Sequence, residues 1–404
     1  MSELSYLEKF LDGVEVEWLP LGEVSALRRG RVMSKGYLTE NFGPYPVYSS
    51  QTANNGKIGS INTFDFDGEY ISWTTDGANA GTVFYRTGKF SITNVCGLIT
   101  LKSKYSLIYK FLFYWLTIEA KKHVYSGMGN PKLMSHQVEN IPVPIPCPDN
   151  PEKSLAIQSE IVRILDTFSV LTAELTAELN MRKKQYNYYR DQLLSFNTED
   201  VPHLPMGQKD IGEFIRGGTF QKKDFIDAGV GCIHYGQIYT YYGTYTEKTK
   251  TYISTALAKK CKKAQKGDLI IATTSENDED VCKAVAWLGS EDIAVSSDAC
   301  IYKHNLNPKY VSYFFQTEQF QNQKRQYITG AKVRRVNADN LSKILIPVPS
   351  MEIQERIVSI LDKFDTLTNS ITEGLPREIE LRQKQYEYYR DLLFSFPKPE
   401  TASN

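Results

Sequence analysis

Two long stretches of the chain carry apolar residues at alternating steps of three and four, the spacing of an amphipathic helix. The positions in the first stretch are Ile161, Ile164, Leu165, Phe168, Leu171, Leu175, Leu179, Tyr186, Tyr189 and Leu193, and those in the second are Ile357, Ile360, Leu361, Phe364, Leu367, Ile371, Tyr386, Tyr389 and Leu393. A stripe this narrow is typical of a coiled coil and favours one partner, most simply the other stretch. As continuous helix, the 39 residues from Gln158 to Phe196 would be about 58 Å long.

The regions before each predicted helix have a different pattern. Residues 16–139 and 201–343 are rich in Tyr, Thr, Ile, Gly and Asn, with short apolar runs punctuated by glycine, which predicts strands and turns. Similar segments at 109–117 (YKFLFYWLT) and 309–317 (KYVSYFFQT) predict one helix in each region. Weaker echoes join WLPLGEV (18–24) to HLPMGQK (203–209), and GEYISWTT (68–75) to GDLIIATT (267–274).

The helical stretches are repeated text. RKKQYNYYRDQLLSF (182–196) recurs as RQKQYEYYRDLLFSF (382–396) with 11 of 15 positions identical, and QSEIVRILDTFSVLT (158–172) recurs as QERIVSILDKFDTLT (354–368) with 9 of 15. Each copy follows alternating Ile/Val-Pro, IPVPIP at 141–146 and ILIPVP at 344–349. The chain is therefore two pseudo-equivalent halves. The globular regions resemble one another far less than the helical stretches do. We therefore expect the helical stretches to form the same scaffold in both halves, and the globular regions to present two different surfaces.

The spacing between the matched blocks differs between the copies. Nine residues separate them in the first copy and thirteen in the second. Because four residues make about one helical turn, we expect the apolar stripe to keep its facing within about 40°. The second copy contains Gly374, Leu375 and Pro376, which predict a local kink or break of that helix.

Composition sets limits on the class of protein. Lys plus Arg and Asp plus Glu are equal at 47 each, so bulk charge indicates neither a nucleic acid nor a membrane partner. No apolar run approaches the ~20 residues that cross a bilayer, and the N-terminal segment lacks the basic and apolar zones of a signal peptide. The six cysteines form no C-x-x-C pair. We expect reduced thiols in a cytoplasmic protein without a membrane association.

Motifs that carry catalysis are missing from the sequence. It has no phosphate-binding G-x-x-x-x-G-K-[ST] loop, no G-x-G-x-x-G after a strand and no Asn-Pro-Pro-aromatic motif of an amino-group DNA methyltransferase. Glu119-Ala-Lys121 resembles the tail of a nuclease motif, but no Asp lies between Leu98 and Thr117 to complete a metal site. We expect a non-catalytic chain with no catalytic residues, no metal site and no cofactor site.

Basic clusters and polar loops are the candidate DNA-binding features. Arginine and lysine can neutralise phosphates, while Asn, Gln, Ser, Thr and acids beside glycine can reach base edges. The candidates in the first region are Arg28, Arg29, Arg31, Ser49, Ser50, Gln51, Asn54, Asn55, Lys57, Thr74, Thr75, Asp76 and Asn79, and those in the second are Arg216, Tyr235, Gln237, Tyr241, Tyr242, Thr273, Thr274, Ser275, Asn277, Lys332, Arg334 and Arg335. A lysine run at 259–266 is a further phosphate candidate. A β-rich domain also exposes such loops to solvent, so composition leaves both interpretations open.

At the doubled Ile-Pro-Val-Pro, Gln-x-x-Ile-Val-x-Ile-Leu-Asp and Tyr-x-Tyr-Tyr-Arg-Asp segments, the chain resembles the specificity subunit of type I restriction–modification enzymes. The resemblance covers essentially the whole length. A tandem TAEL repeat at 172–179 resembles the type IC subgroup. The resemblance also points to two Gly-x-x-x-x-Lys-like loops, GMGNPK (127–132) and GAKVRR (330–335), as segments near DNA, which adds Asn130 and Lys132 to the candidates.

The resemblance implies an α+β fold, in which two α/β target recognition domains are separated by two long antiparallel helices that form a coiled-coil spacer with pseudo-twofold symmetry. The implied parts are an N-terminal helical segment near the C-terminus (residues 1–15), recognition domain 1 (16–140), spacer helix 1 (141–200), recognition domain 2 (201–343) and spacer helix 2 with the tail (344–404). Each domain would read one half of a bipartite, gapped site in double-stranded DNA.

The resemblance also implies partners. Two modification (M) subunits would dock on the helices and use S-adenosylmethionine to methylate adenine at N6, and two restriction (R) subunits would use ATP and Mg²⁺. None of that chemistry would belong to this chain. A coiled-coil scaffold whose globular regions bind protein is the alternative, and steep salt dependence of binding to non-specific DNA would weigh against it.

The tandem TAEL repeat predicts how the DNA gap responds to insertion. A spacer of about 58 Å spans about 17 base pairs at 3.4 Å each. One added TAEL contributes about 6 Å of rise and 40° of rotation, and the rotation matches the ~35° of one base pair while the rise is nearer two. Inserting one TAEL is expected to lengthen the gap by one base pair and leave both half-sequences unchanged. Methylation mapping that shows altered half-sequences would contradict this.

Overall fold

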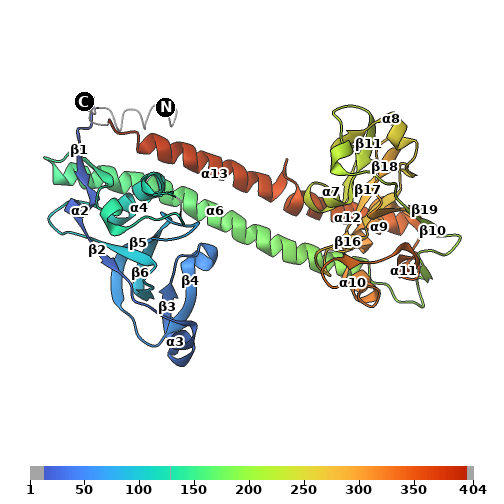
Figure 1. Cartoon of the computed structure of the whole chain (residues 1–404), viewed down its shortest axis with the longest axis horizontal. Coiled ribbons are helices and arrows are strands. Elements are labelled where there is room, and N and C mark those ends of the chain that lie inside the picture. The colour runs from blue at the N-terminus through green and yellow to red at the C-terminus, as the bar shows by residue number, and fades with distance from the viewer. Residues whose placement is uncertain (1–12, 128, 398–404) are drawn as a thin grey trace. The chain divides into compact units, whose positions relative to one another are not determined.

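The computed structural model describes residues 13–127 and 129–397. The chain forms two compact units (Figure 1): unit 1 is Met1–Ala173 with Leu381–Asn404, and unit 2 is Glu174–Glu380. Each unit therefore combines one globular region, the first part of its own scaffold repeat and the last part of the other repeat. Most of the predicted N-terminal segment, residues 1–12, lies outside the described residues.

Unit 1 is built on a six-stranded mixed sheet with strand order β2-β7-β5-β6-β3-β4, beside a two-stranded ladder of β1 and β8. Its strands are β1 (Val16–Pro20), β2 (Ser25–Arg29), β3 (Phe42–Tyr48), β4 (Lys57–Ile61), β5 (Phe66–Thr74), β6 (Val83–Ile92), β7 (Cys96–Leu101) and β8 (Pro142–Pro146). Its helices and helical turns are α2 (Leu21–Val24), α3 (Lys35–Glu40), η1 (Ala53–Gly56), α4 (Tyr109–Glu119), η2 (Ala120–His123) and α5 (Ser135–Val138). The predicted helix at 109–117 is confirmed as α4.

Unit 2 has shorter strands, and they are divided between two sheets and two ladders. A five-stranded sheet has the order β10-β19-β15-β17-β12, a four-stranded sheet has the order β13-β11-β18-β14, and β16-β20 and β21-β9 form two-stranded ladders. The strands are β9 (His203–Pro205), β10 (Gly212–Arg216), β11 (Val230–Ile233), β12 (Tyr245–Thr246), β13 (Thr251–Ile253), β14 (Lys263–Ala264), β15 (Leu269–Ala272), β16 (Thr274–Ser275), β17 (Ala284–Trp287), β18 (Ile293–Val295), β19 (Ala299–His304), β20 (Arg334–Arg335) and β21 (Leu345–Pro347). The helical elements before the scaffold repeat are η3 (Lys222–Asp224), α7 (Tyr235–Thr240), α8 (Thr255–Ala258), α9 (Pro308–Phe314), α10 (Glu318–Arg325) and α11 (Ala338–Leu341).

The first scaffold repeat is one helix, α6 (Pro151–Leu193), 43 residues long. It begins seven residues before Gln158, the start of the matched text, because Pro151 supplies a preset backbone angle and the Asn150 side chain accepts the Lys153 amide at 3.0 Å. The apolar stripe thus predicted the helix correctly and placed its start too late.

The second scaffold repeat is two helices, α12 (Met351–Asn369) and α13 (Gly374–Leu393). The break predicted from Gly374 and Pro376 is confirmed: Gly374 has a φ of +78°, and a Cβ there would lie 2.4 Å from the Thr366 carbonyl oxygen. The expectation that four extra residues add a helical turn is wrong. Residues 370–373 form a non-helical linker instead. The four additional residues of the second copy therefore do not lengthen a helix.

A buried glutamine at the start of each scaffold repeat binds the globular region of the same unit. In unit 1, Gln158 is fully buried, and it accepts the Ile108 amide at 2.8 Å and donates to the Ser106 carbonyl at 2.7 Å. In unit 2, Gln354 accepts the Asn307 amide at 2.9 Å and donates to the Pro349 carbonyl at 2.9 Å. Each glutamine thereby provides a hydrogen-bond acceptor for a backbone amide just before α4 or α9.

One aspartate further along each repeat binds the same two side-chain types. Asp166 accepts from Lys110 Nζ and Tyr114 Oη, both at 2.6 Å. In unit 2, Asp362 accepts from Lys309 Nζ and Tyr313 Oη, both at 2.7 Å. A lysine and a tyrosine four residues apart on one helix face therefore share a carboxylate of the scaffold.

The end of the other repeat completes each unit. Phe168 of α6 stacks on Tyr389 of α13 with ring centroids 5.3 Å apart in unit 1, and Phe364 of α12 lies 5.7 Å from Tyr189 of α6 in unit 2. The unit 1 core also contains Leu393, Phe394 and Phe396. The pseudo-equivalence predicted from the repeated text is thus confirmed within each unit by matching contacts.

Replacing Gln354 by leucine is expected to lower the free energy of unfolding by about 2 kcal/mol, because the partly buried Asn307 amide and the buried Pro349 carbonyl lose their partner. Urea denaturation followed by tryptophan fluorescence measures this, in a chain where Trp18, Trp73 and Trp115 are replaced by phenylalanine so that Trp287 alone reports. Gln383→Leu, at an exposed glutamine of α13, is the control and is expected to change the value by less than about 0.5 kcal/mol. Equal values for the two variants would contradict the role of Gln354.

Acid is expected to weaken unit 2 through His304. Burial lowers the pKa of His304 to about 4, and Nε2 has no hydrogen-bond partner. As the pH falls below about 6.5 the unfolded imidazole binds a proton first, so the free energy of unfolding drops by roughly 2–3 kcal/mol between pH 7 and 4.5. His304→Asn can keep an acceptor for the Leu306 amide and should flatten this pH slope in urea denaturation. An unchanged slope would contradict the assignment.

Candidate DNA interface

In unit 1, three segments bring candidate residues together at one edge of the sheet. Arg29 ends β2, Asp76 follows β5, and Lys132 forms a backbone bridge with Asp76. Arg29 Nη2 donates to the Thr75 hydroxyl at 3.2 Å and to the Asn94 carbonyl at 2.6 Å. Arg29 and Lys132 are exposed. Two exposed cations, one at the end of β2 and one bridged to Asp76, can bind phosphate.

The loop after β3 joins this cluster. Asn79 Nδ2 donates to the Ser50 carbonyl at 3.3 Å, and Thr93 Oγ1 donates to Ser49 Oγ at 2.9 Å. Gln51 donates to the Lys57 carbonyl at 2.7 Å, which closes the loop around Asn54 and Asn55. The two polar loops, 48–57 and 74–81, are therefore neighbours, and their role in reading bases stays a prediction.

Unit 2 holds the corresponding cluster. Arg216 ends β10 and donates from Nε to the Ser297 carbonyl at 3.1 Å, and Arg335 on β20 pairs with Thr274 on β16. These residues line a cavity of about 320 Å³ with Thr273 and Asp298. Tyr235 lies beside them, since its amide donates to Ser296 Oγ at 2.9 Å.

Equivalent hydrogen bonds define how the two clusters correspond. The Thr75 amide donates to the Val95 carbonyl and the Thr273 amide donates to the Asp298 carbonyl. The Thr75 and Thr273 carbonyls accept from Leu133 and Val336, the residues after Lys132 and Arg335. The pairing of GEYISWTT with GDLIIATT is therefore wrong by one residue, because Thr75 corresponds to Thr273 and not to Thr274. Lys132 and Arg335, the last residues of the loops at 127–132 and 330–335, therefore occupy equivalent positions.

Some candidates have side chains that are already committed to the fold. Thr74, Thr75, Thr274, Gln237 and Tyr242 are buried, so they support the loops from inside in this conformation. Arg31 pairs with Asp65 at 3.0 Å. Both amide atoms of Asn277 bind Asp280, at 2.7 Å each, and Arg334 pairs with Asp278 at 2.7 Å. Their DNA contacts stay predictions.

Other candidates have exposed side chains, some of them on the loops that adjoin the clusters. The exposed ones are Arg28, Asn54, Asn55, Lys57, Asn130, Tyr241, Lys332 and, in the lysine run, Lys259, Lys260, Lys262 and Lys266; Ser275 is partly buried on β16. Asp298 and Arg86 were missed by sequence reasoning. Arg86 joins segments 14 and 31 residues away, and no local pattern carries that information.

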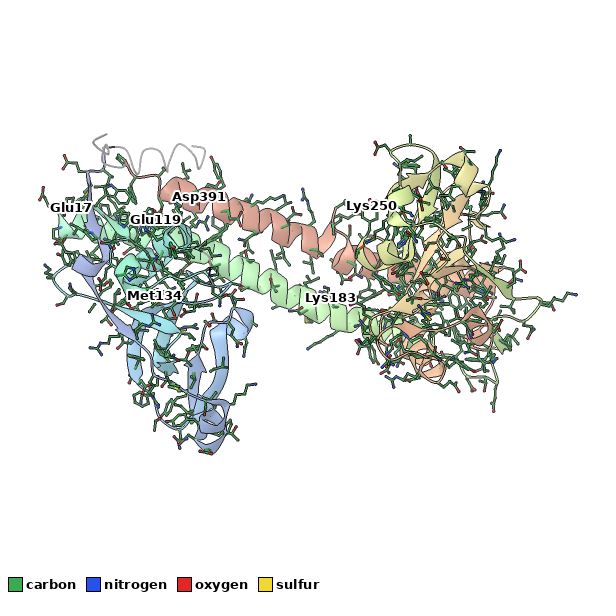
Figure 2. All side chains as sticks on the ribbon, viewed as in Figure 1. Glu17, Glu119, Met134, Lys183, Lys250 and Asp391 are labelled. Carbon is green, nitrogen blue, oxygen red and sulfur yellow. The ribbon has the colours of Figure 1, made fainter. Side chains whose placement is uncertain are left out.

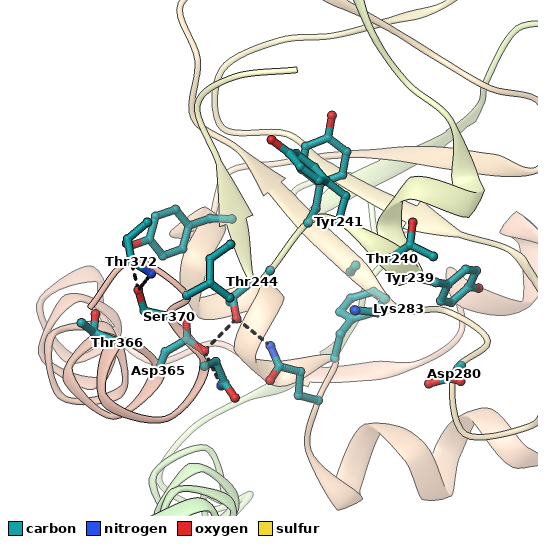
Figure 3. A pocket seen from close by; sticks show the side chains of 18 of the residues that line it. Tyr239, Thr240, Tyr241, Thr244, Asp280, Lys283, Asp365, Thr366, Ser370 and Thr372 are labelled. Carbon is teal, nitrogen blue, oxygen red and sulfur yellow. Dashed lines mark hydrogen bonds between the residues drawn. The ribbon is translucent and has the colours of Figure 1, made fainter. Parts of the chain in front are cut away.

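A cavity of about 780 Å³ lies elsewhere in unit 2 (Figure 3). It lies between the chain 239–245, which includes Tyr241 and Tyr242, and the linker between α12 and α13. Thr244 and Asp365 approach to 3.5 Å there, and burial raises the pKa of Asp365. Four carboxylates line the cavity (Glu279, Asp280, Asp365 and Glu373) against one lysine, Lys283. This charge does not suit a phosphate backbone.

The nuclease-like segment is structural. Glu119, labelled in Figure 2, is buried and pairs with Lys122 at 2.8 Å, with His123 Nε2 at 3.4 Å. Across residues 13–127 and 129–397, no group of three or more His, Cys, Asp or Glu side chains is arranged to hold a metal ion. Within the same ranges, no helix combines the length and apolarity needed to span a bilayer.

Comparison with known proteins gives the family. The model of the type I restriction modification DNA specificity domain matches residues 13–182 and again 205–381. The chain is 40% identical over 428 residues to the EcoR124I/EcoR124II specificity subunit of Escherichia coli, with both chains covered completely. It is 33% identical over 418 residues to a putative type I restriction enzyme specificity subunit of Haemophilus influenzae, covering 97% of this chain and 98% of the relative.

Solved structures agree on the fold. The type I restriction–modification S subunit of M. genitalium superposes with a TM-score of 0.56 at 14% identity, covering 96% of this chain and 98% of that one. At such identity the likeness supports the two-domain α+β fold alone. The family model matches both halves, and the E. coli relative aligns throughout. The chain therefore belongs to the family of type I restriction–modification specificity subunits.

Proposed function

We propose that this chain is the DNA-recognition subunit of a type I restriction–modification system, and that each unit reads one half of a bipartite, gapped DNA site. The duplicated cluster is the observation that carries the proposal. Arg29 with Lys132, and Arg216 with Arg335, stand at equivalent positions among different loops. The sugar-phosphate backbone is the same in both half-sites, so equivalent cations can bind it in both units. The bases differ between the half-sites, so the loops that contact them must differ as well.

The chain works in a complex with modification and restriction subunits and DNA, as its family membership implies. We assign two copies of each partner to the complex, because the two scaffold repeats offer two equivalent docking surfaces. Adenine methylation with S-adenosylmethionine, and ATP- and Mg²⁺-dependent restriction, belong to those partners. This chain contributes recognition and spacing, and no catalytic group.

The spacing role rests on the scaffold helices. The continuous α6, with its tandem TAEL, supplies a length that backbone hydrogen bonding keeps fixed. We propose that this length sets the number of unread base pairs, and that the exposed faces of the scaffold helices bind the modification subunits.

Mapping methylated adenines tests the proposal. The chain reconstituted with an adenine methyltransferase partner is expected to produce one gapped site with two different half-sequences. Exchanging residues 201–343 for the matching region of the E. coli relative should change one half-sequence and keep the other. The unexchanged complex is the control. Methylation by the purified chain alone, or a change in both halves, would overturn the assignment.

A further inference from the structure

A buried arginine stands on an apolar face of the sheet in unit 1. Arg86 on β6 is 3% exposed, and its guanidinium carbon lies 3.6 Å from the ring centroid of Tyr48 and 4.4 Å from that of Phe84. Among the described residues no carboxylate forms an ion pair with it. Burying a guanidinium away from water opposes folding, so the contacts that Arg86 makes need a reason.

Arg86 holds a turn from below. Its Nη1 donates to the Asn55 carbonyl at 2.9 Å and its Nε donates to Ser72 Oγ at 3.0 Å. Gly56 packs directly on it, since a Cβ at that position would lie 3.0 Å from Nη2. The arginine therefore fixes the position of the turn η1, residues 53–56, relative to the sheet.

The turn that Arg86 holds has an uncommon backbone. Asn54 has φ 49° and ψ 41°, and Asn55 has φ 53° and ψ 31°, the left-handed region that asparagine tolerates better than most residues. Both side chains are exposed, and neither amide has a hydrogen-bond partner among the described residues. The fixed backbone of the turn thus exposes the side-chain amides of two consecutive residues, and both are free to bind a ligand.

Unit 2 shows that the fold does not require this arginine. The ladder partner of Arg86 is Tyr70, and the equivalent pair in unit 2 is Asp268 with Trp287, whose amide donates to the Asp268 carbonyl. Ile270 stands where unit 1 has Ser72, and both Ile270 and Trp287 are buried in an apolar cluster. The segment that corresponds to the turn forms α7 in unit 2, because Tyr48 and Ile233 make the same parallel pairing. The buried charge thus belongs to what distinguishes the two units.

We propose that the Asn54–Asn55 turn reads an adenine in the half-site of unit 1, and that Arg86 is its positioning residue. The inference rests on the proposed function. A side-chain amide can donate to adenine N7 and accept from N6 in the major groove, which identifies an A·T pair. Arg86 is buried, so it acts through the turn and touches no base.

The position of the turn agrees with this role. Its loop is tied to the Arg29 cluster through Asn79, which donates to the Ser50 carbonyl. Arg29 and Lys132 can set the register on phosphates, and the amides then face a defined base pair. In unit 2 a different element, α7, stands in that place, as two unlike half-sequences require.

The first experiment removes the amides and keeps the backbone. Asn54→Gly and Asn55→Gly retain the left-handed turn, because glycine adopts it without strain. The complex reconstituted with its methyltransferase partner is titrated with the methylated gapped duplex and with duplexes in which one A·T pair is replaced. The unmodified complex should discriminate roughly 10- to 100-fold at one A·T pair, and at least one glycine variant should lose most of that factor there. Asn62→Ala, at the other end of β4, should retain it.

The second experiment removes the hydrogen bond between Arg86 and the turn and keeps the interior of the sheet filled. The double variant Arg86→Met with Ser72→Ala makes both partners apolar, as in unit 2, so urea denaturation should confirm that it folds. It should lose discrimination at the same A·T pair, keep binding to unrelated DNA and keep the other half-site. Arg86→Lys should recover part of the discrimination, which a loss of stability alone would not produce.

The outcomes separate this inference from the proposed function. Equal weakening on all sequences would make the amides phosphate contacts and overturn it. Unchanged discrimination, or a loss confined to the other half-site, would also overturn it while the recognition function stands. An unmodified complex without sequence preference would overturn the recognition function itself.

Discussion

A shared carboxylate fixes each globular region to its scaffold helix, and the rest of the structure depends on it. Asp166 and Asp362 each bind a lysine and a tyrosine of the helix that carries the sheet. The buried glutamine two turns earlier binds the chain that leads into that helix. Because side chains of fixed geometry meet at two points, the sheet cannot rotate on the scaffold, and the loops at its edge keep a defined direction.

This arrangement separates what must be constant from what may differ. The constant part is the scaffold, which in both units supplies a buried glutamine, an aspartate that accepts from a lysine and a tyrosine, and a Phe–Tyr ring contact. The variable part lies at the sheet edge, where unit 1 has a left-handed turn over Arg86 and unit 2 has a helix over Trp287. The unit with the polar Arg86–Ser72 pair inside its sheet carries the turn, and the unit with the apolar Trp287–Ile270 pair carries the helix.

Sequence reasoning predicted the periodic parts well and the tertiary parts poorly. The stripe of Ile161, Leu165 and Phe168 identified α6, and Gly374 with Pro376 identified the break before α13. The alignment of GDLIIATT with GEYISWTT was wrong by one residue. Two adjacent threonines can be aligned in more than one way from sequence, and only the hydrogen bonds of Thr75 and Thr273 show which residues correspond. Arg86 was missed because its partners are distant in sequence. Thr74 and Thr75 are polar in the text and buried in the structure, since a neighbouring strand and loop cover them.

The interlaced composition of the units has a consequence for synthesis on the ribosome. Unit 2 is a continuous stretch of chain, whereas the core of unit 1 needs Leu393, Phe394 and Phe396 from the far end. Until those residues emerge, Phe111 and Trp115 of α4 lack the rings that cover them. During synthesis, all of unit 2 leaves the ribosome before the last segment of unit 1 does. Until that segment emerges, the apolar side of α4 stays exposed, and chaperones can bind it. A chain that ends before Phe394 leaves Phe111 and Trp115 without that ring.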